Sequence, residues 1–212
     1  MIEYKIGDCL GLMKELPDES VDLILTDPPY GISKEGIEND DNLEVYHNSL
    51  PELYRVLKSC SFFVTFVSIG NLPDFLKQNF FVYRWQMIQY INNGMVRGGI
   101  GFNRYLSILI FQKGEAKITK PALDIKEYST SAAACEKRLH PTEKMADFVS
   151  YLMVHFSKPG AFVLDPFCGS GTTLLAARRT GRNCLGFEIN PEYEKAIKKR
   201  IMESTPNLES YA

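Results

Sequence analysis

Residues 162–173 read FVLDPFCGSGTT, an apolar run that ends in an aspartate, turns through two glycines and leads into helix-forming residues. This order predicts a strand at Phe162–Leu164, a tight loop at Asp165–Gly171 and a helix at Thr172–Thr180. Loop glycines let the backbone come close to a ligand, and the start of a helix offers unpaired N–H groups. The stretch therefore predicts a ligand site at the end of a strand in an α/β fold.

The strand predicted next, Asn183–Ile189, contains Glu188 and is followed by Asn190, about 20 residues after the glycines. An acid at this distance suits the two hydroxyls of a ribose. A dinucleotide-binding fingerprint would need a third glycine where Leu174 stands, and a P-loop would need a G-K-[S/T] sequence, which does not follow. The pattern alone leaves two interpretations open: a nucleoside-type cofactor site, or an ordinary turn between a strand and a helix.

Strands and helices alternate along the rest of the chain. Strands are predicted at Ile2–Ile6, Val21–Thr26, Phe62–Phe66, Val82–Ile91 and Tyr105–Phe111, and helices at Cys9–Leu16, Glu44–Leu57, Leu72–Gln78, Thr142–Phe156 and Pro191–Met202. This alternation predicts an open three-layer α/β sheet, whose ligands bind at the carboxyl ends of the strands. We expect Val82–Ile91 and Tyr105–Phe111 to pair antiparallel across the glycine-rich Asn93–Gly101, with Trp85 in the core. Residues 114–139 are polar and without period, which predicts a loop or an insertion.

Residues 26–31, TDPPYG, directly follow the continuous apolar strand Val21–Thr26. Two consecutive prolines lock the backbone and donate no hydrogen bonds, so they hold Asp27 and Tyr30 in fixed positions. Asp27 and the Pro28 carbonyl can accept both N–H bonds of a planar amino group while Tyr30 stacks on its ring. The alternative is a strand-ending turn with a capping aspartate.

The 212 residues include 45% hydrophobic and 24% charged side chains and carry a net charge of −2, the balance of an ordinary globular protein. The five cysteines are scattered without a C-x-x-C pair, which argues against a disulfide framework or a zinc ribbon and favours a reducing cytoplasm. We find no leader and no apolar run long enough to span a bilayer, and we expect no membrane association. Between Asp74 and Glu115 the chain has no carboxylate but five lysines and arginines, which indicates either a basic strip for a polyanion or a partly buried sheet segment.

Three motifs taken together decide between these interpretations: TDPPYG, DPFCGSGTT and, at residues 138–145, RLHPTEKM. Their sequence and order resemble the β class of amino-methylating DNA methyltransferases, and the similarity extends from about Met1 to Arg200. The resemblance implies a three-layer Rossmann-like methyltransferase fold with a mostly parallel seven-stranded sheet, one antiparallel strand and a circularly permuted motif order. It also implies a single catalytic domain over residues 1–212, with 114–139 as a short insertion or a reduced target-recognition region.

The resemblance implies S-adenosylmethionine as methyl donor, S-adenosylhomocysteine as product, and no metal ion. The positions that match the family's cofactor site are Asp8, Asp165, Phe167, Cys168, Gly169, Gly171, Thr172, Glu188 and Asn190, together with His140, Pro141, Thr142 and Lys144 of the HPTEK segment. Glu188 matches the ribose-binding acid, Asp8 the position facing the adenine, and the glycine loop wraps the methionine portion. Cys168 is expected to be a small neighbour in this loop and not a nucleophile.

The resemblance assigns the reaction to Asp27, Pro28, Pro29 and Tyr30. It implies direct methyl transfer to the exocyclic amine of a base that is flipped out of the DNA helix and stacked on Tyr30. In this family an aspartate before PPY accompanies N6-adenine more often than N4-cytosine, so Asp27 favours adenine. N4-cytosine methylation, methylation of RNA and a catalytically silent nucleic-acid-binding module stay open as alternatives.

Double-stranded DNA is the expected partner, with Arg97, Arg104, Lys117 and Lys120 as candidate contacts. Such enzymes methylate DNA in restriction-modification systems. Because the segment before the HPTEK motif is short, the enzyme either reads a very short site or depends on a second subunit for specificity. The resemblance also implies a homodimer.

Overall fold

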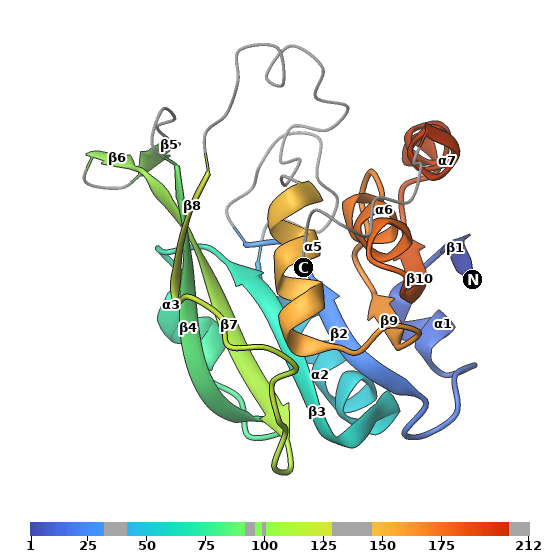
Figure 1. Ribbon diagram of the computed structural model, residues 1–212, viewed down its shortest axis with the longest axis horizontal. Coiled ribbons are helices and arrows are strands. Elements are labelled where there is room, and N and C mark those ends of the chain that lie inside the picture. Colours follow the sequence, from blue (N-terminus) through green and yellow to red (C-terminus); the bar gives the residue numbers. More distant parts are fainter. Residues whose placement is uncertain (32–41, 92–95, 99–100, 129–145, 204–212) are drawn as a thin grey trace.

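The computed structural model describes residues 1–31, 42–91, 96–98, 101–128 and 146–203 (Figure 1). Its strands are β1 (Ile2–Ile6), β2 (Val21–Thr26), β3 (Leu57–Val67), β4 (Val82–Ile91), β5 (Val96–Gly98), β6 (Gly101–Asn103), β7 (Tyr105–Lys113), β8 (Ile125–Tyr128), β9 (Phe162–Asp165) and β10 (Asn183–Glu188). Its helices are α1 (Cys9–Met13), α2 (Glu44–Val56), α3 (Leu72–Leu76), α5 (Ala146–Phe156), α6 (Thr172–Arg179) and α7 (Glu194–Glu203), and a short 3-10 turn, η1 (Pro191–Tyr193), precedes α7.

The large sheet has the strand order β1-β10-β9-β2-β3-β7-β4-β8. All neighbours pair in parallel except around β7, which runs antiparallel to β3 and β4. These pairings confirm the mostly parallel sheet and the predicted antiparallel pair. The sheet has eight strands, one more than expected, because Ile125–Tyr128 pairs with the end of β4 inside the segment predicted to be a loop. Four residues at a sheet edge show too little alternation to be recognised in a sequence.

Two further predictions concern segments that the structure describes only in part. The helix predicted at Thr142–Phe156 is described from Ala146 onward as α5, and its predicted N-cap lies outside the described residues. The described parts of the glycine-rich link form a small hairpin, β5–β6, which projects beyond the ends of β4 and β7 (Figure 1).

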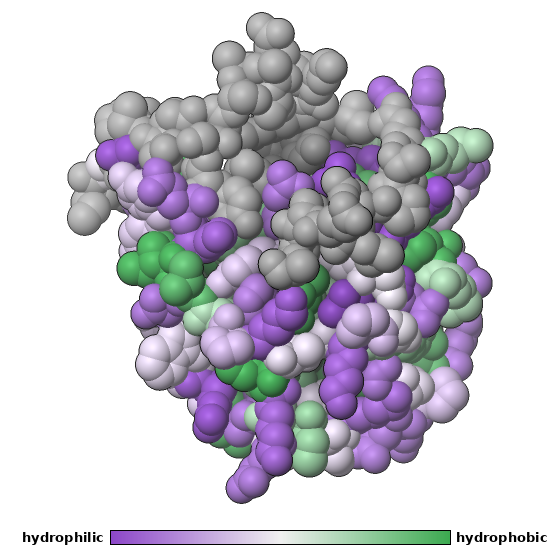
Figure 2. All heavy atoms as spheres, in the orientation of Figure 1, coloured by the Kyte–Doolittle hydropathy of each residue, from purple (hydrophilic) through white to green (hydrophobic). Residues whose placement is uncertain are grey.

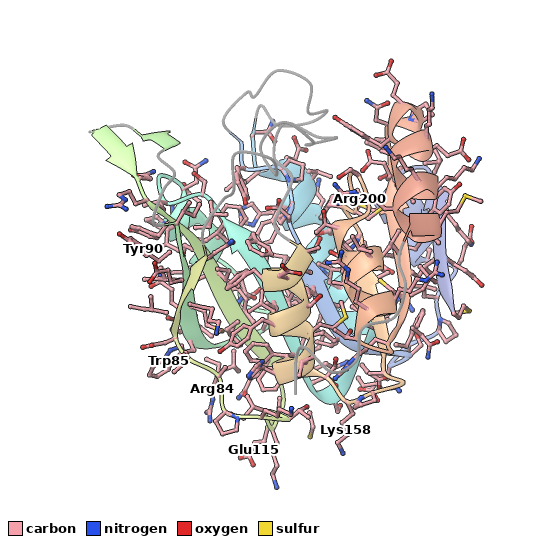
Figure 3. The ribbon with its side chains drawn as sticks, turned by 45° about the horizontal axis from the view of Figure 1, so that its top comes forward. Arg84, Trp85, Tyr90, Glu115, Lys158 and Arg200 are labelled. Carbon is pink, nitrogen blue, oxygen red and sulfur yellow. The ribbon has the colours of Figure 1, made fainter. Side chains whose placement is uncertain are left out.

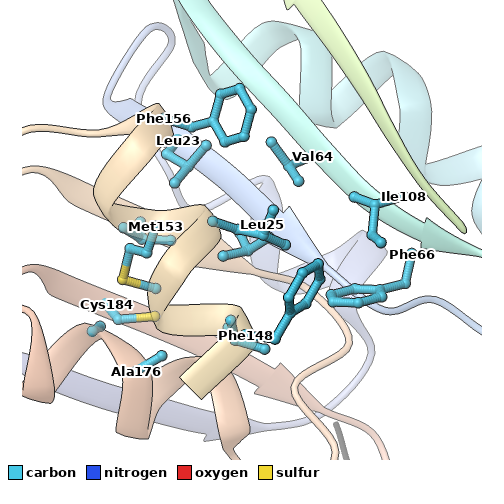
Figure 4. Close-up of a cluster of buried hydrophobic side chains, with 14 of the residues drawn as sticks. Leu23, Leu25, Val64, Phe66, Ile108, Phe148, Met153, Phe156, Ala176 and Cys184 are labelled. Carbon is cyan, nitrogen blue, oxygen red and sulfur yellow. The ribbon is translucent and has the colours of Figure 1, made fainter. Parts of the chain in front are cut away.

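An apolar core lies on each face of the sheet. On one face α5, α6 and α7 contribute to a cluster of buried side chains that includes Leu23 of β2 and Val64 of β3 (Figure 4). On the other face α1, α2 and α3 cover Ile24 and Phe63, the neighbours of these residues in the same strands. Because successive side chains of a strand enter opposite cores, these strands are apolar throughout. The result is the three-layer α/β arrangement expected from the sequence.

The strand order reverses between β9 and β2, which are neighbours in the sheet. From β9 the chain passes through α6 to β10 on one side, and from β2 it passes through α2 to β3 on the other. Ligands of open α/β sheets bind outside the carboxyl ends of the strands at such a reversal. The fold therefore places a binding site next to Thr26 and Asp165, the last residues of these two strands.

None of the described helices is long and apolar enough to cross a membrane. Figure 2 shows mainly hydrophilic side chains over the described part of the front face, with apolar residues in small separate groups.

The position of Trp85 differs from the prediction that it packs in the core. Its side chain is 58% exposed, and Val82 and Tyr83 beside it are exposed as well. A bulge interrupts β4 between Tyr83 and Trp85, and β8 pairs with β4 only from Ile88 onward. In the described structure the first half of β4 is thus an outer edge of the sheet, where Arg84 and Trp85 point outward (Figure 3). A bulge and a charged residue protect such an edge from pairing with another strand.

The fluorescence of this single tryptophan should report its exposure. We expect iodide to quench the emission of the native protein almost as strongly as that of the urea-unfolded chain, because solvent already reaches the indole of Trp85. Stern–Volmer titrations in buffer and in urea measure this directly. Quenching that rises several-fold only on unfolding would show a buried indole and contradict the position described.

Candidate active site

A buried hydrogen bond joins the two strand ends at the reversal. The Thr26 hydroxyl donates to Oδ1 of Asp165 at 2.6 Å, and both side chains are buried. The same oxygen accepts the backbone N–H of Phe167 at 3.2 Å, and the hydroxyl of Thr173 in α6 also bonds to this carboxylate. The Asp165 side chain thereby holds β2, the glycine loop and α6 in fixed positions relative to one another.

Burial raises the pKa of Asp165 to about 6, because a charged carboxylate loses its hydration inside the protein. The hydrogen bonds from Thr173, Thr26 and Phe167 lower this pKa, and the negative charge of Asp27 raises it. A cation bound near Asp165 would favour the charged carboxylate. The environment of Asp165 therefore suits a positively charged ligand.

Glu188, at the end of β10, holds the glycine loop in place. One oxygen of its carboxylate accepts the backbone N–H of Gly169 at 2.7 Å, and the other accepts that of Asn190 at 2.8 Å. Gly169 and Gly171 have φ angles of 51° and 86°, a conformation that glycine adopts without strain. The acid expected to bind a ribose thus lies directly beside the loop expected to bind the methionine portion.

Cys168 fills the space between this loop and β10. A Cβ built on Gly186 would lie 2.9 Å from both Cβ and Sγ of Cys168, so β10 needs a glycine opposite the loop. Cys168 is 5% exposed, and burial raises the pKa of its thiol well above the usual value. A buried thiol that stays protonated is a poor nucleophile. This environment gives Cys168 a packing function.

The TDPPYG loop leaves β2 at the same edge of the sheet. Pro28 is buried, and the other three residues of DPPY are half-buried. The Tyr30 hydroxyl donates to Oδ1 of Asp27, and the Asn71 side chain donates to the Tyr30 carbonyl at 2.6 Å. The Tyr30 ring also meets Phe75 of α3 edge-on, with the ring centroids 6.3 Å apart. These contacts hold the carboxylate and the aromatic ring of the motif in one arrangement.

Asp8 and Asn190 lie at this edge too, each at the start of a helix. Asp8 follows β1 and accepts a backbone N–H of α1 at 3.1 Å, and Asn190 follows β10 and accepts a backbone N–H of η1 at 2.9 Å. The N–H of Gly7 donates to the Glu188 carbonyl at 2.8 Å, which places the Asp8 turn next to Glu188. The predicted cofactor residues of the three strand ends are therefore neighbours.

Some predicted residues lie outside the described part of the chain, namely His140, Pro141, Thr142, Lys144 and the side chain of Arg97. Sequence reasoning missed Thr26, Asn71 and Thr173 as supports of the site. No sequence motif identifies these three residues as part of the site, because each bonds to a residue that is distant along the chain or in another element. Among the described residues, no three His, Cys, Asp or Glu side chains stand close enough to hold a metal ion.

The candidate nucleic-acid contacts fall at opposite edges of the sheet. Arg104 precedes β7 at the edge that carries the site, and its guanidinium lies over the Tyr90 ring, 5.1 Å from the centroid. Lys117 and Lys120 follow the end of β7, where the backbone bonds to the end of α5. Figure 3 shows Tyr90 and Glu115 well apart along the sheet, and Glu115 directly precedes the segment with these lysines. The antiparallel β7 carries the chain away from the site, so Lys117 and Lys120 lie at the other edge of the sheet from Arg104.

Comparison with known families identifies the arrangement of the two loops. Residues 21–199 match the family model of N6/N4 methyltransferases, described as DNA methylase. The chain belongs to this DNA methylase family. The match includes both the DPPY loop after β2 and the glycine loop after β9, so the two loops of the candidate site are parts of the family's shared region.

Individual relatives of this DNA methylase cover most of the chain. YubD of Escherichia coli K12, named as a methylase, is 31% identical over 209 residues, which are 95% of this chain and 90% of YubD. YhdJ of the same organism, named as a DNA adenine methyltransferase, is 28% identical over 92% of this chain and 81% of YhdJ.

Solved structures have the same fold. The complex of M1.HpyAVI with S-adenosylmethionine aligns with a TM-score of 0.74 and 29% identity, over 95% of this chain and 99% of that one. The cytosine-N4-specific PvuII DNA methyltransferase aligns with a TM-score of 0.79 over 98% of this chain and 89% of that one, and at 22% identity it shows the fold alone.

The raised pKa of Asp165 predicts how this methylase responds to pH. The pKa of this carboxyl is about 6 in the folded state and near its usual value of 3.8 in the unfolded chain. Between these values the folded protein binds more protons, so the free energy of unfolding falls as pH rises. Asp165→Asn removes this contribution. The free energy of unfolding of the variant minus that of the wild type should therefore rise as the pH is raised from 4 to 7.

Urea denaturation of both proteins at several pH values measures this difference, in which the contributions of groups that do not interact with Asp165 cancel. If the free energy of unfolding of the variant minus that of the wild type stays constant or falls as pH rises, the pKa of Asp165 is not raised.

Proposed function

We propose that this chain transfers a methyl group from S-adenosylmethionine to the exocyclic N6 of adenine in DNA. One observation carries the proposal: the DPPY loop and the glycine loop leave adjacent parallel strands at the reversal of the sheet, where Thr26 and Asp165 join them. A donor on the glycine loop and an acceptor on the DPPY loop would meet across this bond. Family membership supports the assignment.

The side chains at this edge fit S-adenosylmethionine. When bound, it supplies an electrophilic methyl group on a positively charged sulfonium. Asp165 offers a buried carboxylate whose ionisation a nearby cation would favour. Glu188 offers acceptor oxygens beside Gly169 for the ribose hydroxyls, and the turn of Asp8 adjoins it. We also assign the HPTEK residues at 140–144 to the cofactor's methionine end.

The DPPY loop suits the amine that accepts the methyl group. The lone pair of this amine is delocalised into the base, so it is a weak nucleophile. Asp27 and the Pro28 carbonyl accept its two N–H bonds and favour a geometry in which the lone pair points at the methyl carbon. Tyr30 orients the Asp27 carboxylate through its hydroxyl and offers its ring to the base. The base must leave the helix to reach this position.

Adenine is the proposed base because Asp27 precedes PPY, the pairing more common among N6-adenine enzymes. The relative YhdJ, named as an adenine enzyme, agrees with this choice. The same fold also occurs in a cytosine-N4-specific enzyme, so N4-cytosine is the second candidate. Both bases present the same kind of amino group to the loop.

On the side of the DNA, we propose that Arg104 and the β5–β6 hairpin contact the duplex at the edge of the sheet that carries the site. We further propose that residues 1–212 act as one catalytic domain in the cytoplasm. A homodimer or a second subunit would add specificity, since the segment after β7 is short.

The reaction itself gives the first test. Labelled S-adenosylmethionine and unmodified DNA should yield N6-methyladenine, identified by nucleoside digestion and mass spectrometry. Asp27→Asn should lower kcat at least about 100-fold, because it removes charge from the group that accepts the amine's N–H bond. Binding of S-adenosylhomocysteine should be retained. Asp18→Asn, at an exposed carboxylate outside the site, is the control and should keep full activity.

Each outcome of this assay has a distinct meaning. N4-methylcytosine would keep the mechanism and overturn the choice of base. Methyl transfer to RNA but not to DNA would overturn the substrate. Full activity of Asp27→Asn would exclude the proposed role of Asp27.

Arg104→Ala tests the contact with DNA. We expect weaker binding to all sequences and a shallower dependence of log K on log salt, by about one unit of slope, because one phosphate contact is lost. Lys117→Ala removes the same charge at the opposite edge and should change neither quantity. Fluorescence anisotropy with a labelled duplex at several salt concentrations measures both, and equal effects of the two variants would contradict the assignment.

A further inference from the structure

Arg200 lies buried on α7 next to the first residue of α6. Its side chain is 6% exposed, and Nη1 donates to the hydroxyl oxygen of Thr172 at 2.6 Å. Thr172 is 8% exposed and directly follows Gly171 of the glycine loop. Figure 3 shows Arg200 on the inner side of α7. A cation of α7 thus contacts the residue that directly follows the glycine loop.

The two threonines that begin α6 are oriented by opposite charges. Thr173 bonds to the carboxylate of Asp165, so its hydroxyl proton is used. Thr172 accepts from Arg200, so an oxygen lone pair is used and its proton points away from the guanidinium. A cation bonded to the hydroxyl oxygen also strengthens that hydroxyl as a donor. Thr172 is therefore prepared to donate a hydrogen bond to an anion.

The start of α6 favours an anion for a second reason. The backbone N–H groups of the first turn and the macrodipole create a positive potential there. A guanidinium at this end opposes the macrodipole, and its burial costs hydration. An anion bound at the same place would be attracted by both the macrodipole and the guanidinium.

We propose that Arg200 is a positioning residue for the carboxylate of the cofactor's methionine portion. It holds the Thr172 hydroxyl in the orientation that donates to this carboxylate. The inference rests on the proposed function, in which the glycine loop before Thr172 binds the methionine portion of S-adenosylmethionine.

The packing of α7 does not depend on Arg200 alone. Ile197 is fully buried, and its Cα lies 3.5 Å from the Cβ position of Gly171. Arg178 of α6 donates to the carbonyl of Ile201 in α7. A variant that loses the Arg200 guanidinium should therefore keep the helix in place.

Titration calorimetry with two ligands tests the inference. S-adenosylhomocysteine carries the amino-acid carboxylate, whereas 5′-methylthioadenosine has the same nucleoside and sulfur without it. Arg200→Gln should weaken binding of S-adenosylhomocysteine about tenfold, as expected for a hydrogen bond to a charged group. Its affinity for 5′-methylthioadenosine should stay within about twofold of wild type. Lys195→Gln, at an exposed position of the same helix, removes an equal charge and should change neither affinity.

Variants of Thr172 give an independent test, which also serves if Arg200→Gln fails to fold. Thr172→Val should reproduce the selective loss for S-adenosylhomocysteine, and Thr172→Ser should retain the affinity. The double variant with Arg200→Gln should bind no worse than Thr172→Val alone, because the two residues act through the same hydroxyl.

The results separate the inference from the proposed function. Equal losses for both ligands, or unchanged binding of S-adenosylhomocysteine to Arg200→Gln or Thr172→Val, would overturn the inference and show that Arg200 only packs α7 against α6. Failure of the wild-type protein to bind either ligand would contradict the proposed cofactor, and the inference with it.

Discussion

The buried hydrogen bond from Thr26 to Asp165 connects the two halves of the sheet at the point on which the site depends. The backbone ladder between β2 and β9 is short, with register pairs only at Leu23 and Ile24 of β2. The side-chain bond continues this connection past the ladder to the residues from which the two functional loops start. Because Thr26 is buried, loss of the Asp165 carboxylate would leave its hydroxyl without this partner, and an unsatisfied buried polar group costs about 1–3 kcal/mol. The backbone ladder and this side-chain bond together hold the starting points of the two loops next to each other.

Charge is divided in space around this bond. Carboxylates gather at the carboxyl edge of the sheet, where Asp165 is buried and Glu188 holds the glycine loop. They suit a cationic donor and an amino group. Two arginines lie farther from these carboxylates. Arg200 of α7 contacts the first residue of α6, and Arg104 directly precedes β7. The small net charge of −2 is the sum of separate acidic and basic regions, which suit a cationic cofactor and anionic DNA respectively.

The segment after β7 has a structural task that its polar composition does not suggest. Ala116 and Ala122 pack against the core, and the backbone N–H of Leu123 donates to the Tyr151 hydroxyl of α5 at 2.7 Å. The segment then ends as the edge strand β8. Its described half thus completes the sheet, which leaves less of this short region for reading a DNA sequence. The proposal of a second subunit that adds specificity starts from this shortness.

The sequence by itself determined the class of fold, most strand and helix positions, and the two loops, because buried parallel strands, prolines and glycines leave strong local patterns. It did not reveal β8, the exposure of Trp85 or the separation of Lys117 and Lys120 from Arg104. These depend on which strand covers which, and on the direction in which β7 runs. Nor did it mark Thr26, Asn71 and Arg200, since each supports a residue that only folding brings near. Short motifs contain the residues that contact the ligands, whereas the contacts that orient these side chains connect residues distant along the chain.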